Sequence, residues 1–436
     1  MAILDVLRGL LGVLILLGIC FLLSRDRKLI NWHLVGGGVA LQMILAVLIL
    51  ATPFGVVVEW VSSGFVALLG MSDVGAKFMF GELIDASRYG FAFKVLPTIL
   101  FVAALTSLFY YLGILQRIVF SFAWVMKRLM RLSGAESLAT AANVFVGQTE
   151  APLVVRPYVG GMTKSELMAL MTGGMATIAG SVFGLYVATL GGADEATQIA
   201  VARQLLTASM MNAPAALLVA KMLVPEREEF DENLFVPREK AGRNALDALA
   251  QGTIDGLKLA LNVAAMLIVF VAVIALLNAI LGWFGGLGGS EEKSGVIDGW
   301  IASLSRGVFS GLSLEAILGF LFAPIAGAIG AEWNDVLQLG QLLGTKMVAN
   351  EFIAYLQLSG LTENGLSPKS VFLATFALCG FANFSSIGIQ IGGIGALAPE
   401  RRGDLAELGF KAMIGGTIAS LLTASIAGMF WVVVEG

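Results

Sequence analysis

Three polar side chains occupy consecutive positions in an otherwise apolar stretch of the chain. They are an amide, a hydroxyl and a carboxylate: Gln148, Thr149 and Glu150. Gly147 precedes them and Pro152 follows, and both residue types interrupt a helix and free its backbone groups. Because a charged group is costly in an apolar environment, a polar cluster at such a break is a candidate binding site.

Three further clusters have the same character. They contain Thr177, then Asn350 and Glu351, then Asn383, Ser385 and Ser386. Two carboxylates with several amides and hydroxyls provide the donors and acceptors that suit a neutral, polyhydroxylated ligand. Phe381 and Phe384 add apolar faces for a flat ring. A strongly anionic ligand would need Arg or Lys, which these clusters lack.

A helix break can also form a small cation site, because its free carbonyl groups are oxygen ligands. Asn143 and the carbonyl of Val146 come just before the first cluster, and Thr177 and the carbonyl of Ile178 lie in the next apolar run. Together these four residues could hold Na⁺.

Structural interpretations of the same residues stay open. Glu150 and Glu351 could each pair with buried backbone or with Arg156. Asn383 and Ser386 could join helices, as Asn and Ser often do in membranes. Phe381 could belong to a plain core, and the glycine-rich runs 173–180 and 392–395 could serve close helix packing.

The composition is that of an integral membrane protein. The 436 residues are 58% hydrophobic and only 13% charged, with a mean hydropathy of +0.87, whereas soluble domains carry roughly 25% charge. No basic patch indicates nucleic-acid binding. The single histidine, His33, excludes a multi-His metal site, and Cys20 and Cys379 form no disulfide framework.

Apolar stretches of helix length must position the clusters. A membrane-spanning helix needs about 20 apolar residues, and strand alternation is absent. We therefore expect an all-α polytopic membrane protein with about eight transmembrane helices. The predicted spans are 2–23, 34–52, 95–126, 164–190, 205–224, 244–284, 371–398 and 412–434. Residues 312–330 form a further apolar stretch, short or bent, and the 244–284 stretch suits a long tilted helix.

Two polar stretches do not fit as spans. Residues 134–161 and 334–359 each read as a re-entrant helical hairpin whose polar tip lies at mid-membrane. Each hairpin is followed by a polar-centred span and a plain span, so the layout repeats. An odd number of crossings separates the two units, which makes them an inverted repeat, as in secondary transporters.

Lys and Arg set the expected orientation. They are about twice as frequent on one side, in residues 25–33, 127–131 with Lys164, 225–243 and 400–411, as on the opposite side. The side with more Lys and Arg is expected to be cytoplasmic. Residues 225–243 would then be a cytoplasmic linker, and both termini would lie outside. Arg88, Lys94 and Lys293 count among the external residues. The first apolar stretch has its charges after it, so we read it as a retained helix rather than a cleaved signal.

The motifs resemble those of the concentrative nucleoside transporters, in particular the bacterial members. The resemblance lies in residues 147–157 (GQTEAPLVVRP), 350–355 (NEFIAY) and 379–389 (CGFANFSSIGI), in this order. It implies eight spans with two re-entrant hairpins, and Na⁺-coupled nucleoside uptake by a homotrimer in a bacterial inner membrane. Na⁺ would be the co-transported ion, without an organic cofactor.

The resemblance also implies roles for individual residues. Gln148, Thr149 and Glu150 would bind the nucleobase and nearby ribose, and Val182 would pack on the base. Glu351, Asn383 and Ser386 would bind ribose hydroxyls beside Phe381. Asn143, Val146, Thr177 and Ile178 match Na⁺ ligand positions, with Thr177 where some relatives have Ser.

The chain then divides into five expected parts. They are scaffold helices (1–133), a first transport repeat (134–224), the cytoplasmic linker (225–243), a long scaffold or trimerisation helix with its connector (244–330) and a second transport repeat (331–436). The transport repeats would move in an elevator-like manner. H⁺ coupling, a different small polar solute, a passive channel and a membrane-embedded enzyme remain as alternatives, and the sequence does not choose between pyrimidines and purines.

Overall fold

The computed structural model describes residues 2–84, 93, 96–192, 194–229, 242–289, 295–363 and 365–435. Within these ranges the regular elements are all helical. The predictions for Arg88, Lys94 and Lys293, for residues 230–241 of the linker and for residues 290–294 lie outside the described residues.

Five α-helices precede the first hairpin in the described part of the chain. They are α1 (Ala2–Leu23), α2 (Trp32–Leu50), α3 (Gly55–Phe80), α4 (Leu96–Tyr111) and α5 (Ile114–Met130). The α3 helix was missed from the sequence, because polar residues such as Glu59 and Asp73 lower its hydropathy to 1.5, against 2.6 for α1. The predicted span 95–126 is strongly bent: α4 and α5 meet at 77°, and Gly113 lies between them with a positive φ of 76°.

The first predicted repeat begins with a hairpin whose two arms differ. A capping box between Ser133 and Glu136 starts α6 (Gly134–Asn143), and the chain returns through the short helices α7 (Ala151–Val154) and α8 (Arg156–Val159). The predicted span 164–190 is broken into α9 (Lys164–Ala176) and α10 (Gly180–Gly191). It is followed by α11 (Glu195–Leu223), which begins ten residues before the predicted boundary at residue 205.

The second predicted repeat has the same order of elements. Its hairpin consists of α15 (Val336–Val348) and α16 (Glu351–Glu363). The predicted span 371–398 is broken into α17 (Pro368–Leu378) and α18 (Phe384–Leu397). The chain ends with α19 (Arg402–Gly428) and the short α20 (Trp431–Glu435), which lies against α1.

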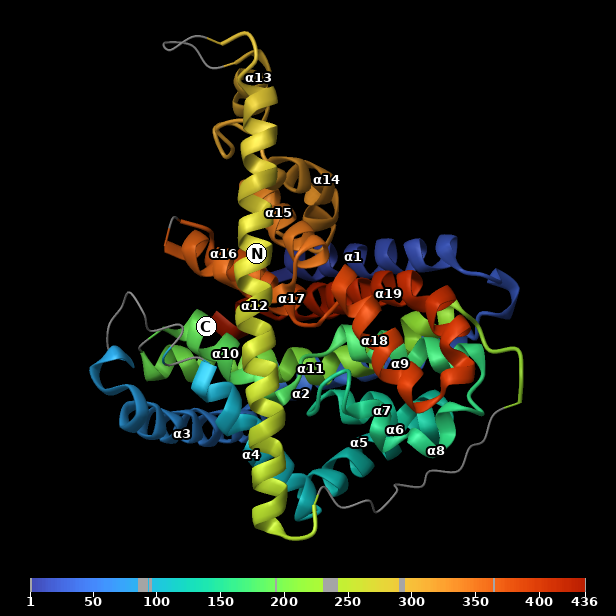
Figure 1. The fold of residues 1–436 in the computed structure, drawn as a ribbon. Coiled ribbons are helices and arrows are strands. Elements are labelled where there is room, and N and C mark those ends of the chain that lie inside the picture. The colour runs from blue at the N-terminus through green and yellow to red at the C-terminus, as the bar shows by residue number, and fades with distance from the viewer. Residues whose placement is uncertain are drawn as a thin grey trace.

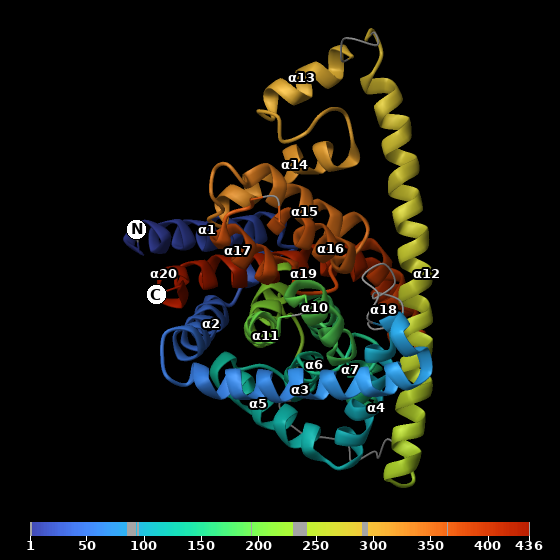
Figure 2. The ribbon, with the colours of Figure 1, turned by 90° about the vertical axis from the view of Figure 1, so that its left-hand side faces the viewer.

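A single long helix stands beside this core. The α12 helix (Ala245–Gly285) has 41 residues, as the sequence predicted, and runs along one side of the molecule (Figure 2). It contacts α4 near one end and α13 (Val296–Leu304) and α14 (Leu314–Ala328) near the other (Figure 1). Its apolar side chains stay largely exposed.

The two repeats interlock in the centre of the molecule. The α9 and α11 helices both pack against α19, and α11 also contacts α17. By length and composition, six described helices could each cross a membrane, and the bent α4–α5 pair would make a seventh crossing. An all-helical membrane protein is therefore confirmed, whereas the predicted count of about eight spans stays a prediction.

Candidate functional site

The tips of the two hairpins open onto one cavity of about 380 Å³. The breaks that follow the hairpins, the start of α18 and one face of α12 complete its wall. All eight residues that the sequence analysis assigned to ligand binding line it. They are Gln148, Thr149, Glu150, Val182, Glu351, Phe381, Asn383 and Ser386. Residues more than 200 positions apart therefore share one chamber.

Asn383 joins the start of a helix to the second hairpin tip. It is the N-cap of α18, and its Oδ1 accepts a hydrogen bond from the Ser386 amide at 2.9 Å. Its Nδ2 donates to Glu351 Oε2 at 3.1 Å. The capping hydrogen bond thus fixes the orientation of the Asn383 side chain, so that its Nδ2 points toward the carboxylate of Glu351. The Glu351 residue is only 5% exposed.

The first hairpin tip is held by hydrogen bonds between the side chains of Gln148, Ser386 and Gln390. Gln148 Nε2 donates to Ser386 Oγ at 3.1 Å, and Gln148 Oε1 accepts from Gln390 Nε2 at 3.0 Å. Gln390 also donates to the carbonyl of Met171. Both the amide orientation of Gln148 and its position against α18 are therefore determined by residues of the other repeat.

Sequence reasoning missed two of these partners. Tyr186 donates its hydroxyl to Glu351 Oε1 at 2.8 Å, and Gln390 fixes Gln148. Each lies four positions after a predicted site residue, Val182 or Ser386, on the same helix. Because side chains at i and i+4 share a helix face, this spacing was a usable signal.

The α12 helix supplies a polar wall that the sequence analysis did not foresee. Asp255, Lys258 and Asn262 line the cavity together with the hairpin tips. Asp255 and Lys258 also line a neighbouring cavity of about 540 Å³, together with Glu150 and Arg156. Glu150 and Arg156 are exposed to these spaces rather than enclosed in a packed core. The long helix therefore contributes directly to the chamber.

The predicted cation ligands lie where the first hairpin meets the α9–α10 break. Phe145 accepts at its carbonyl from the Gly180 amide at 3.1 Å, which joins residues 143–146 to residues 177–180. Asn143 is 1% exposed, and in the described chain neither polar atom of its side chain has a hydrogen-bond partner. Thr177 Oγ1 donates to the Gly173 carbonyl and keeps lone pairs free. An amide oxygen that is buried and has no donor among the described residues, beside a hydroxyl and the backbone carbonyls of a helix break, fits a small hard cation.

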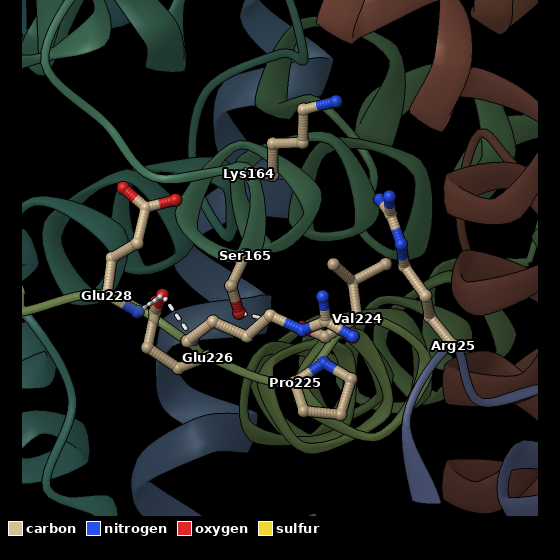
Figure 3. A pocket seen from close by; sticks show the side chains of 8 residues that line it. Arg25, Lys164, Ser165, Val224, Pro225, Glu226 and Glu228 are labelled. Carbon is tan, nitrogen blue, oxygen red and sulfur yellow. Dashed lines mark hydrogen bonds between the residues drawn. The ribbon is translucent and has the colours of Figure 1, made fainter. Parts of the chain in front are cut away.

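A third pocket, which is lined by charged side chains, lies at the end of α11, where the linker begins (Figure 3). Its basic side chains are already paired: Arg25 and Lys164 contact Glu407 at 3.1 and 2.6 Å, and Arg227 contacts Asp26 at 3.1 Å. This pocket binds segments of the chain to each other and offers no comparable set of free polar groups.

Two broken-helix repeats that meet around a polar chamber in an all-helical, multi-pass membrane protein define the class of secondary transporters. Comparison with family models identifies the branch of this class. The Na⁺ dependent nucleoside transporter N-terminus matches residues 11–83, the nucleoside recognition segment matches 92–193, and the Na⁺ dependent nucleoside transporter C-terminus matches 204–428.

Full-length relatives agree with these matches. An uncharacterized transporter of Haemophilus influenzae is 42% identical over 98% of each chain. Sodium/nucleoside cotransporter 1 of Rattus norvegicus is 37% identical over 97% of this chain, which spans 63% of that protein. The chain belongs to the concentrative nucleoside transporter family.

Solved structures show the same fold. The structure of CNTnw in an inward-facing substrate-bound state superposes with a TM-score of 0.86 at 38% identity, over 98% of each chain. A CNTnw variant in an outward-facing state superposes with a TM-score of 0.88 at 38% identity, over 99% of each chain. The family resemblance found in the motifs is thus confirmed, and the family is one of transporters rather than enzymes.

Proposed function

We propose that this protein takes up nucleosides, uridine-like molecules among them, by Na⁺ symport. The observation that carries the proposal is the shared chamber, in which both hairpin tips and both helix breaks contribute to one wall. Its acids, amides and hydroxyls match the donors and acceptors of a neutral sugar and a nucleobase. Membership of the family supports the same substrate class.

In this proposal the two halves of the chamber bind different parts of the nucleoside. Glu351, Asn383 and Ser386 bind ribose hydroxyls, because a carboxylate accepts hydrogen bonds from two hydroxyl groups at once. Gln148, Thr149 and Glu150 read the polar edge of the base and the adjoining ribose. Val182 and Phe381 pack against the flat ring.

Na⁺ binds at the neighbouring break and is the second cargo. Asn143 and Thr177 supply side-chain oxygens, and Val146 and Ile178 supply carbonyls. The support is the buried, unpartnered amide of Asn143 and the joined backbone of the two segments. Since ion and nucleoside occupy adjacent breaks of one unit, the inward Na⁺ gradient drives uphill uptake.

The movement and assembly follow from the same division of the chain. The repeats at 134–224 and 331–436 form the transport unit and move in an elevator-like manner against the scaffold. The exposed apolar α12 suits lipid and subunit contacts, and we propose a homotrimer in a bacterial inner membrane. The similarity to CNTnw in both inward- and outward-facing states is in keeping with alternating access.

The test is uridine uptake into proteoliposomes with an imposed inward Na⁺ gradient. We expect accumulation above the external concentration, competition by other nucleosides and loss of uptake when choline replaces Na⁺. Uptake driven by a pH gradient alone would show that nucleoside transport is coupled to protons instead of Na⁺. Equilibration without accumulation would indicate a passive channel, and absence of nucleoside competition would remove the substrate assignment.

A further inference from the structure

The two helix breaks lie directly against each other. Gly380, in the break between α17 and α18, has a φ of +131°. A Cβ atom added there would lie 2.7 Å from the carbonyl carbon of Ala176, the last residue of α9. The end of one broken helix therefore touches the break of the other, without space for a side chain between them.

One side chain binds both ends at this crossing. Asn212 lies within α11 and is 0% exposed. Its Nδ2 donates to the carbonyl of Ala176 at 2.7 Å and to the carbonyl of Cys379 at 3.0 Å. The last carbonyls of a helix have no partner within that helix. The amide group of Asn212 therefore donates to the ends of two half-helices that belong to different repeats, and the Cys379 carbonyl accepts a further hydrogen bond from Ser420 Oγ at 2.8 Å.

The two carbonyls are each followed by a different part of the site. Ala176 directly precedes Thr177 and Ile178, the proposed Na⁺ ligands. Cys379 is followed by the segment that carries Phe381 and Asn383, the proposed nucleoside contacts. If the peptide group at either break changes its orientation, the side-chain amide of Asn212 must shift with it, and this amide is also bonded to the other break.

We propose that Asn212 is a positioning residue that couples Na⁺ binding to nucleoside binding. Na⁺ bound at the first break orders the end of α9, and Asn212 transmits this order to the end of α17 and so to the nucleoside contacts. This inference rests on the proposed Na⁺ symport and adds to it the residue that links the two cargoes. In the described chain the Oδ1 atom of Asn212 has no partner, so the side chain acts through its two amide hydrogens.

The experiment measures binding linkage rather than uptake. The dissociation constant of uridine is determined for the purified full-length protein with saturating Na⁺ and with choline in its place. The ratio of the two constants is the coupling factor, and Na⁺ affinity with and without uridine must change by the same factor. Asn212→Leu removes both donors, and Asn212→Ser retains one hydroxyl donor.

We expect the coupling factor of Asn212→Leu to fall at least about fivefold, near the lower end of typical couplings, and that of Asn212→Ser to be intermediate. The matched control is Gln42→Leu. Gln42 is an equally buried amide that donates to the Met211 carbonyl and to Thr423 Oγ1 without touching either break. Its loss should lower thermal stability and leave the coupling factor unchanged.

The outcomes separate the two proposals. If the uridine affinity of the wild-type protein is the same with and without Na⁺, the proposed symport itself is overturned. A wild-type coupling factor retained in both Asn212 variants overturns the positioning role and leaves the symport intact. An equal loss in Gln42→Leu would also overturn it, because the effect would then come from general loosening of the core.

Discussion

The hydroxyl of Tyr186 donates to Glu351 Oε1 at 2.8 Å, which connects α10 of the first repeat to the acidic tip of the second hairpin. Asn383 donates to the other carboxylate oxygen at 3.1 Å. Glu351 therefore has a fixed orientation in a buried position, and each repeat contributes one of the two groups that fix it. Such preorganisation lowers the entropy lost when a ligand binds.

Removal of this hydroxyl should weaken nucleoside binding. A hydrogen bond to a charged group contributes about 1.5–3 kcal/mol, so we expect Tyr186→Phe to raise the dissociation constant of uridine by roughly tenfold or more. Isothermal titration in Na⁺ measures this. The matched control is Tyr355→Phe, since the hydroxyl of Tyr355 donates to the Thr375 carbonyl instead of to Glu351. Equal losses in both variants would contradict the specific role of Tyr186.

Glu351→Gln should abolish uridine uptake while the protein remains folded. The variant keeps the size of the side chain, but one of its two oxygen acceptors becomes a donor, which removes acceptor capacity for ribose hydroxyls. Uptake in proteoliposomes and monodisperse elution measure the two effects. Glu195→Gln, at the exposed start of α11, is the control and should transport normally. Unchanged uptake in Glu351→Gln would refute the ribose assignment.

Asn143 should determine Na⁺ affinity without contributing to the stability of the Na⁺-free protein. Its side chain is buried and has no hydrogen-bond partner in the described chain, so Asn143→Leu removes an unsatisfied polar group. We expect a Na⁺ half-saturation constant at least about tenfold higher, because one oxygen ligand is lost.

Thermal unfolding with and without Na⁺ checks this prediction. A bound ligand stabilises the native state, so Na⁺ should raise the melting temperature of the wild-type protein and have little effect on Asn143→Leu. Asn143→Asp, which retains an oxygen at this position, should keep the Na⁺ response. A Na⁺ response of wild-type size in Asn143→Leu would exclude this residue from the ion site.

Gly380 should tolerate no side chain. A Cβ atom there would clash with Ala176, and the φ of +131° is itself unfavourable for other residues. We expect Gly380→Ala to lower the free energy of unfolding by several kcal/mol, beyond the range of most substitutions, and to reduce the yield of folded protein. Gly388→Ala in α18 is the control, because no atom lies within 4 Å of an added Cβ at that position. A stable Gly380→Ala variant would show that the crossing can open.

Much of the site could be predicted from the chain itself. Polar groups such as Glu351 and Asn383 are costly at membrane depth, so their presence in otherwise apolar stretches marked the tips and breaks in advance. The α3 helix was missed because scattered polar residues lower its mean hydropathy. The bend between α4 and α5 was missed because apolar composition does not show the direction in which a helix runs. The roles of the site residues and the five-part division of the chain stay predictions.

The sequence by itself determined most of the helical segments, the polar tips and breaks that form the site, and the family that the chain resembles, because these properties depend on local chemistry and on the cost of polar groups in lipid. Only the tertiary structure decided which side chains meet. Tyr186 reaches Glu351, Gln390 reaches Gln148, and Asn212 reaches the ends of two broken helices. These contacts join residues 36 to 242 positions apart, and the packing of helices, rather than sequence spacing, sets which of their faces touch.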